Sequence, residues 1–92
     1  MGTKMNPGAH DCYMKAAPDE PMFILLGRDK HAPQLVSMWC TLRAGAGEDP
    51  AKVEEARQCA RDMIKYLRAH GKEPDTSILR VFAVFTGDVM PL

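Results

Sequence analysis

The chain has 92 residues, which is enough for one domain. Its 12 Lys and Arg balance its 12 Asp and Glu, and a zero net charge argues against a general nucleic-acid-binding protein, which needs a basic surplus. Hydrophobic residues make up 46%, too many for a disordered chain, and 3 cysteines, an odd number, argue against a disulfide-stapled domain. We therefore expect a reduced protein in the cytoplasm.

Residues 1–18 are expected to form a flexible N-terminal arm, and residues 19–92 a single compact domain. The arm contains Pro7, Gly8 and Pro18 and shows neither a helical nor a strand period. It lacks the apolar stretch of a secretion signal. No apolar run in the chain approaches the roughly 20 residues that span a bilayer. We expect neither export nor membrane insertion.

Two apolar runs predict strands. Residues 22–26 are continuously apolar between Pro21 and Gly27, and this short length favours a buried strand. Residues 78–85 are rich in β-branched and aromatic side chains, although a helix is the alternative there. Two strands make a poor sheet alone, and exposed edges invite pairing with another subunit.

A first helix is predicted over about residues 32–44, with Asp29 as its cap and Pro33 in its first turn. Leu35, Trp39 and Leu42 share one stripe of this helix, while Met38 lies off the stripe. The apolar surface is thus wider than one face requires, as in a helix that is sandwiched between two layers or used at an interface.

A second helix is predicted to begin with Asp49 as cap and Pro50 in the first turn, and to stop at Gly71. A single core-facing stripe recurs every three or four positions, at Val53, Ala56, Ala60, Met63 and Leu67. The small Ala56 and Ala60 allow close approach to the first helix. The expected fold is α+β, in the order strand–helix–helix–strand, with a helical hairpin core completed by oligomerisation.

The junction between the first strand and the first helix is a candidate anion or nucleotide site. A helix N-terminus favours an anion, and Arg28, Lys30 and His31 add cationic donors there. Neither a P-loop nor a Gly-x-Gly-x-x-Gly pattern is present. The alternative is that Asp29 caps the helix and the basic residues are simply solvated.

Trp39, Arg57 and Arg61 are candidate interface residues. A single Trp in an apolar helix is typical of a core or a subunit interface, and ligand stacking is the other possibility. The two arginines lie four apart on one side of the second helix and need acidic partners. The simpler and favoured alternative is a solvated face with internal ion pairs.

The sequence supports neither a metal site nor a cofactor, and it shows no catalytic constellation. His10, Asp11 and Cys12 are neighbours, but the close-paired ligand spacing of zinc sites is missing. Adjacent carboxylates such as Glu54 and Glu55 point away from each other, so they do not form an acid/base pair. We expect them to lie on a solvated face. The remaining enzymatic alternative is a cysteine nucleophile with a histidine partner. No local motif indicates such a pair.

Two stretches resemble small uncharacterised proteins encoded by bacteriophages and prophages. One runs through residues 19–29 and on to Ala32, Pro33, Val36 and Trp39, and the other covers residues 49–57 and 60–63. The resemblance spans roughly residues 19–70 and transfers no catalytic residues. It implies a phage accessory protein that acts in the bacterial cytoplasm.

The expected function is therefore non-enzymatic and stoichiometric. The protein is expected to act in counter-defence, either by inhibiting a host defence protein through the helical hairpin or by sequestering an anionic nucleotide signal. A homo-oligomer is expected in both cases. A small cysteine-dependent enzyme and a purely structural oligomeric phage protein are the alternatives.

Overall fold

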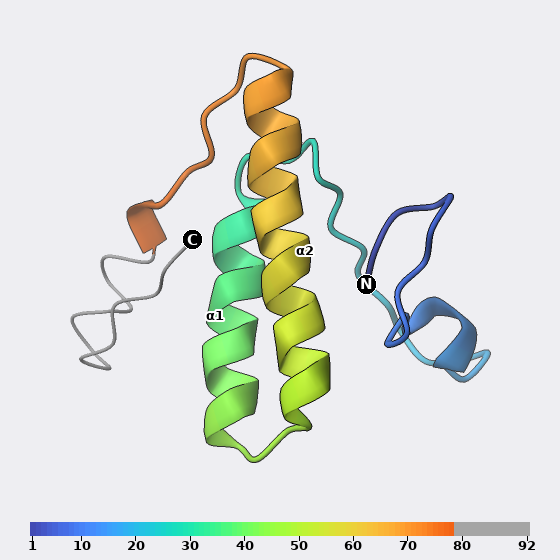
Figure 1. The fold of residues 1–92 in the computed structure, drawn as a ribbon. Coiled ribbons are helices and arrows are strands. Elements are labelled where there is room, and N and C mark those ends of the chain that lie inside the picture. Colours follow the sequence, from blue (N-terminus) through green and yellow to red (C-terminus); the bar gives the residue numbers. More distant parts are fainter. Residues whose placement is uncertain (79–92) are drawn as a thin grey trace.

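The structure, a computed structural model, describes residues 1–78. Its two α-helices, α1 (Ala32–Gly45) and α2 (Pro50–Ala69), run antiparallel as a hairpin (Figure 1). A short 3-10 helix, η1 (Tyr13–Lys15), lies in the N-terminal arm. The arm sits on the α2 side of the hairpin, and the chain that leaves α2 returns along the α1 side (Figure 1). The predicted helical hairpin is thus confirmed.

The predicted α+β class is wrong, because the structure has no β-strand among residues 1–78. Residues 22–26 are extended but pair with no other strand. They are not buried either, since Phe23 is 85% exposed. A continuous apolar run indicates a buried strand only where a neighbouring strand supplies hydrogen bonds and a second layer covers the side chains. Beyond Ile78, the predicted second strand lies outside the described residues.

The bounds of α1 agree with the prediction to within a residue, but its cap does not. His31 occupies the cap position without a side-chain hydrogen bond. Asp29 instead accepts the His31 N–H at 2.9 Å, so its carboxylate closes the turn that precedes the helix. Pro33 lies in the first turn as expected. After the helix the chain reverses at Gly47, whose φ of 83° favours glycine.

The prediction for α2 is confirmed at both ends. The Asp49 carboxylate accepts the Ala51 N–H at 3.0 Å, and Pro50 is the first helical residue. The helix ends at Ala69, and Gly71 follows with a φ of 74°. Between the two helices, Arg43 and Lys52 both form ion pairs with Glu48. The loop is therefore held from both sides.

The two helices pack through small side chains. Ala56 and Ala60 of α2 are fully or almost fully buried, as are Ser37 and Cys40 of α1. The core stripe of α2 is as predicted, except that Ile64 is buried and Met63 only half-buried. Because the alanines let the helix backbones approach closely, α1 presents its own small residues to α2.

This close packing turns the predicted apolar stripe of α1 outward. Leu35 and Leu42 are exposed, and Trp39 is half-buried and touches the edge of the core. Only one side of α1 can face α2 at close distance, and that side carries the small side chains. Leu35 and Leu42 are left exposed on the opposite side.

Candidate functional site

The outer face of α1 is formed by four apolar side chains: Leu35 and Leu42 are exposed, whereas Met38 and Trp39 are half-buried. Leu42 is 59% exposed and Leu35 is 37% exposed. The Arg43 guanidinium lies 6.0 Å from the centre of the Trp39 ring, within the range of a cation–π contact. Trp and Arg flanked by aliphatic side chains are typical of protein–protein interfaces.

A second apolar surface is the extended segment of residues 22–26. Met22, Phe23, Ile24 and Leu26 are between 49% and 85% exposed. The backbone groups of residues 21–25 form no hydrogen bond in the part of the chain that the structure describes. The segment therefore offers both apolar side chains and free backbone donors and acceptors.

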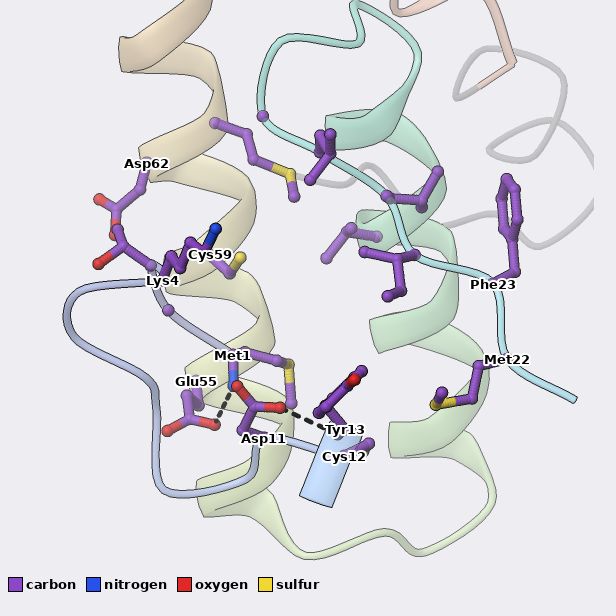
Figure 2. A pocket seen from close by; sticks show the side chains of 18 of the residues that line it. Met1, Lys4, Asp11, Cys12, Tyr13, Met22, Phe23, Glu55, Cys59 and Asp62 are labelled. Carbon is purple, nitrogen blue, oxygen red and sulfur yellow. Dashed lines mark hydrogen bonds and ion pairs between the residues drawn. The ribbon is translucent and has the colours of Figure 1, made fainter. Parts of the chain in front are cut away.

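An open groove of about 1310 Å³ lies between the arm, this segment and the two helices. Figure 2 shows the groove with α2 on one side and the extended segment, carrying Met22 and Phe23, on the other. Its lining combines apolar side chains such as Val36 and Met63 with polar ones from the arm. The groove is wide open, unlike the enclosed pockets that hold small ligands.

Glu55 of α2 fixes the arm at the edge of this groove (Figure 2). Its carboxylate accepts the backbone N–H groups of Ala9 and His10 at 2.7 and 2.9 Å. It also accepts a hydrogen bond from the Met1 ammonium at 3.4 Å. Partial burial works to raise the Glu55 pKa, but the His10 and Ala9 N–H groups and the ammonium outweigh it, so the pKa is lowered.

Glu55 is not recognisable as a functional residue from the sequence, whose pattern predicts a solvated face for both Glu54 and Glu55. Glu54 is indeed exposed and pairs with Arg61. No local pattern distinguishes the two glutamates, because the partners of Glu55 are backbone groups about 45 residues away. Only the folded chain brings them together.

His10 is placed between two carboxylates at the same point. Its Nδ1 lies 3.3 Å from Glu55 and its Nε2 lies 3.9 Å from Asp49. Nδ1 is buried and has no hydrogen-bond partner with suitable geometry. The His10 ring thus brings the arm close to Asp49, the cap residue of α2, as well as to Glu55.

The three predicted anion-binding residues lie together in the exposed turn before α1. Arg28 and Lys30 form no ion pair within the described residues. His31 is engaged, because its Nδ1 lies 3.0 Å from the Asp75 carboxylate.

The anion-binding capacity of this turn is reduced by its own acidic side chains. The N–H of His31 is donated to the Asp29 side chain and that of Ala32 to the Asp29 carbonyl, while Pro33 has none. The pKa of Asp75 is lowered by hydrogen bonds from Ser77 and, against some desolvation, by His31. The turn thus combines two unpaired cations with two carboxylates, and the anion site stays a prediction.

The three predicted interface residues are split between the helices. Trp39 belongs to the outer face of α1. Arg61 is engaged on its own helix, with Glu54 at 2.7 Å and Gln58 at 2.9 Å. Arg57 is half-buried. Of the three, Trp39 is the one that borders the exposed leucines of α1, although it is half-buried and packs against the core.

The cysteines show little sign of nucleophilic activation. Burial raises the pKa of the Cys40 thiol and of the Cys59 thiol, which lowers their thiolate fraction at neutral pH. Cys12 is exposed, and its Sγ contacts the backbone oxygen of His10 at 3.6 Å. Across residues 1–78 no group of three His, Cys, Asp or Glu side chains is arranged to hold a metal ion.

Comparison with known proteins adds no further assignment. No family model, no curated protein and no solved structure matches this chain. Among the described residues, neither helix is long and apolar enough to cross a membrane. Functional conclusions therefore rest on the surfaces described above.

Proposed function

We propose that this chain is a non-enzymatic accessory protein that binds a protein partner stoichiometrically through the outer face of α1. The observation that supports the proposal is the exposure of Leu35 and Leu42 beside the half-buried Trp39. Aliphatic side chains around an aromatic anchor bury apolar area on association, at about 25 cal/mol per Å² before the costs of binding.

The structure of α1 favours a protein rather than a small ligand on this face. A helix that is apolar on two opposite sides needs a second layer, and α2 covers only one side. The groove described above is lined by Val36 of α1 and not by the residues of this outer face. A partner helix or groove that receives positions i, i+4 and i+7 has the right shape.

The proposed biological role is counter-defence in a bacterial cell. It takes up the expected resemblance of roughly residues 19–70 to small uncharacterised phage and prophage proteins, since small phage accessory proteins often work by binding a target. The partner would then be a host or defence-system protein, blocked while the outer face of α1 is bound.

The decisive experiment is co-purification of the tagged chain from its bacterial host, followed by native mass spectrometry of the complex. Leu42→Asp places a charge in the outer face and is expected to weaken binding of the isolated partner by more than about tenfold. Lys65→Asp, an exposed change on α2, is the matched control and should bind normally. Equal binding by both variants would reject the outer face of α1 as the site.

A second candidate is sequestration of an anionic nucleotide at Arg28, Lys30 and His31. It is supported by the exposed, unpaired Arg28 and Lys30. Titration calorimetry with a panel of nucleotides should show binding by the parent protein and loss of binding by Arg28→Ala. Binding that survives Arg28→Ala would exclude this site.

A further inference from the structure

The described part of the chain ends beside α1, where two contacts hold it. The backbone N–H of Ile78 donates to the side-chain oxygen of Gln34 at 3.0 Å, and Gln34 is only 4% exposed. Earlier in the same stretch, the Asp75 N–H donates to the Lys30 carbonyl oxygen at 3.0 Å. Between these two contacts, the Asp75 carboxylate accepts the Ser77 N–H at 2.9 Å. The position and course of the chain at Ile78 are therefore fixed relative to α1.

The same contacts give the direction in which the chain runs along α1. The earlier contact, at Lys30, lies before the helix, and the later one, at Gln34, lies in its first turn. The chain thus advances from the N-terminus of α1 towards its C-terminus, on the α1 side of the hairpin (Figure 1). Because residues four apart lie one turn apart on the same side of a helix, Met38 follows Gln34, and Leu42 follows Met38. Continued in this direction, the chain passes along the outer face of α1.

The residues directly after Ile78 are apolar, as is the face that they approach. Six of the seven residues 79–85 are apolar, and Arg80 is the exception. On α1, the described chain leaves Leu35 and Leu42 exposed. The gain from removing apolar area from water grows with that area, so an apolar segment beside an apolar face favours contact between the two.

We propose that residues 79–85 of this chain pack on the outer face of α1 and cover Leu35, Met38 and Leu42 in the free protein. The length of the segment fits this face. From Leu35 to Leu42 the helix rises by about 10 Å, at 1.5 Å per residue. Seven residues span about 10 Å as a helix and about 23 Å when extended. The segment is therefore long enough to cover the face in either conformation.

The attachment at Ile78 favours this segment over a separate molecule as the cover of the outer face. A segment joined to its site by a short connection has an effective concentration in the millimolar range. A second copy or another protein must instead give up translational and rotational freedom when it binds. Apolar contacts that are too weak to hold a separate molecule can therefore hold residues 79–85 in place.

The protein partner proposed above would use the same face of α1. Residues 79–85 then compete with it, and the partner binds only after the segment has left the outer face. The apparent affinity for the partner is lowered in proportion to the fraction of chains whose outer face is free. This regulatory consequence rests on the proposed function, whereas the packing of the segment on α1 does not.

Nuclear magnetic resonance on the full-length chain, without any partner, tests the packing directly. We expect nuclear Overhauser contacts between the rings of Phe82 or Phe85 and the methyl groups of Leu35 and Leu42. These contacts should persist when labelled chain is diluted into an excess of unlabelled chain, because they lie within one molecule. Contacts between chains only, contacts to residues 22–26 instead, or no contact at all would each overturn the proposal. None of these results would touch the proposed partner site.

Charge substitutions in the full-length chain test which surface the segment covers. Phe82→Asp combined with Phe85→Asp should free the outer face and raise the fluorescence of bound anilinonaphthalene sulfonate, a dye for exposed apolar surface, by at least about twofold. Adding Leu42→Asp should reverse most of this increase. Val89→Asp places a charge beyond the segment and is the matched control, with helical circular dichroism as the folding check. An unchanged signal in the double variant, an equal increase in the control, or an increase that Leu42→Asp does not reverse would contradict the proposal.

Discussion

At the scale of single residues, Glu55 is the side chain that binds the N-terminal arm at three points. One carboxylate receives two backbone N–H groups and the Met1 ammonium, all from the arm. Hydrogen bonds to an ionised group are about twice as strong as neutral ones. Within residues 1–78 the neighbouring Glu54 has no such backbone partners and forms an ion pair with Arg61.

Replacing Glu55 with Gln is expected to release the arm. The amide keeps the size of the side chain but loses the charge, and its NH₂ group would face the donors of Ala9 and His10. Trypsin should then cut after Lys4 and Lys15 about tenfold faster than in the parent protein. Glu54→Gln is the control and should leave the cleavage rate unchanged. Slow cleavage of Glu55→Gln would show that other contacts hold the arm.

The same carboxylate predicts how docking of the arm depends on pH. Its pKa is lowered from the ordinary value of 4.5, so the stabilisation is complete well above pH 4.5 and is lost as the pH falls through the lowered pKa. The amide proton shifts of Ala9 and His10 should follow this titration. In Glu55→Gln, no transition below pH 4.5 should remain at these two amides.

At the scale of elements, the apolar periodicity of the sequence predicts the packed face of α2 but not that of α1. The single apolar stripe of α2 faces α1, as its period indicates. On α1, apolar residues occur on several sides of the helix. The side that packs against α2 is the one with small residues such as Ser37 and Cys40. Close helix contact requires small residues on both partners, and this requirement outweighs the burial of two leucines.

Enlarging the contact at Ala60 should therefore be costly. Ala60 is 1% exposed, so Ala60→Leu forces the helices apart or strains side chains, at about 1–3 kcal/mol of unfolding free energy. Ala51→Leu adds the same atoms at an exposed position of α2 and should change stability by less than about 0.5 kcal/mol. Urea denaturation of both variants gives the comparison. Similar values would mean that the helix crossing is loosely packed.

At the scale of the whole molecule, polar contacts attach both flanking regions to the hairpin. Glu55 holds the arm against α2. On the other side, the backbone N–H of Asp75 donates to the Lys30 carbonyl oxygen at 3.0 Å. The Asp75 carboxylate also lies 3.0 Å from Nδ1 of His31. The Ile78 N–H reaches the side chain of the buried Gln34 at 3.0 Å. Each attachment depends on one or two side chains, so each can be released separately.

Gln34→Ala tests the attachment after α2. It leaves the Ile78 N–H without its acceptor and should cost about 1–3 kcal/mol locally. Faster hydrogen exchange at Ile78 is expected, while the amides in the centre of α2 keep their protection. Thr76→Ala alters an exposed residue of the same stretch and is the control. Unchanged exchange at Ile78 would mean that Gln34 is dispensable there.

The sequence by itself determined the two helices and their ends. The cap at Asp49, the prolines at 33 and 50 and the glycines after each helix act within a few residues, so their effects are readable locally. The apolar stripe of Val53, Ala56 and Ala60 likewise predicts that the two helices pack as a hairpin. The residues named for an anion site were found together in one turn because they are neighbours in the chain.

Only the tertiary structure decided which surfaces are covered. Residues 22–26 have the composition of a strand, but strand formation needs a partner, which composition cannot supply. The outward turn of Leu35 and Leu42 follows from the alanines of α2. Glu55 acquires its role from backbone groups of a distant arm. In each case the deciding interaction joins residues far apart in the chain, where local patterns carry no information.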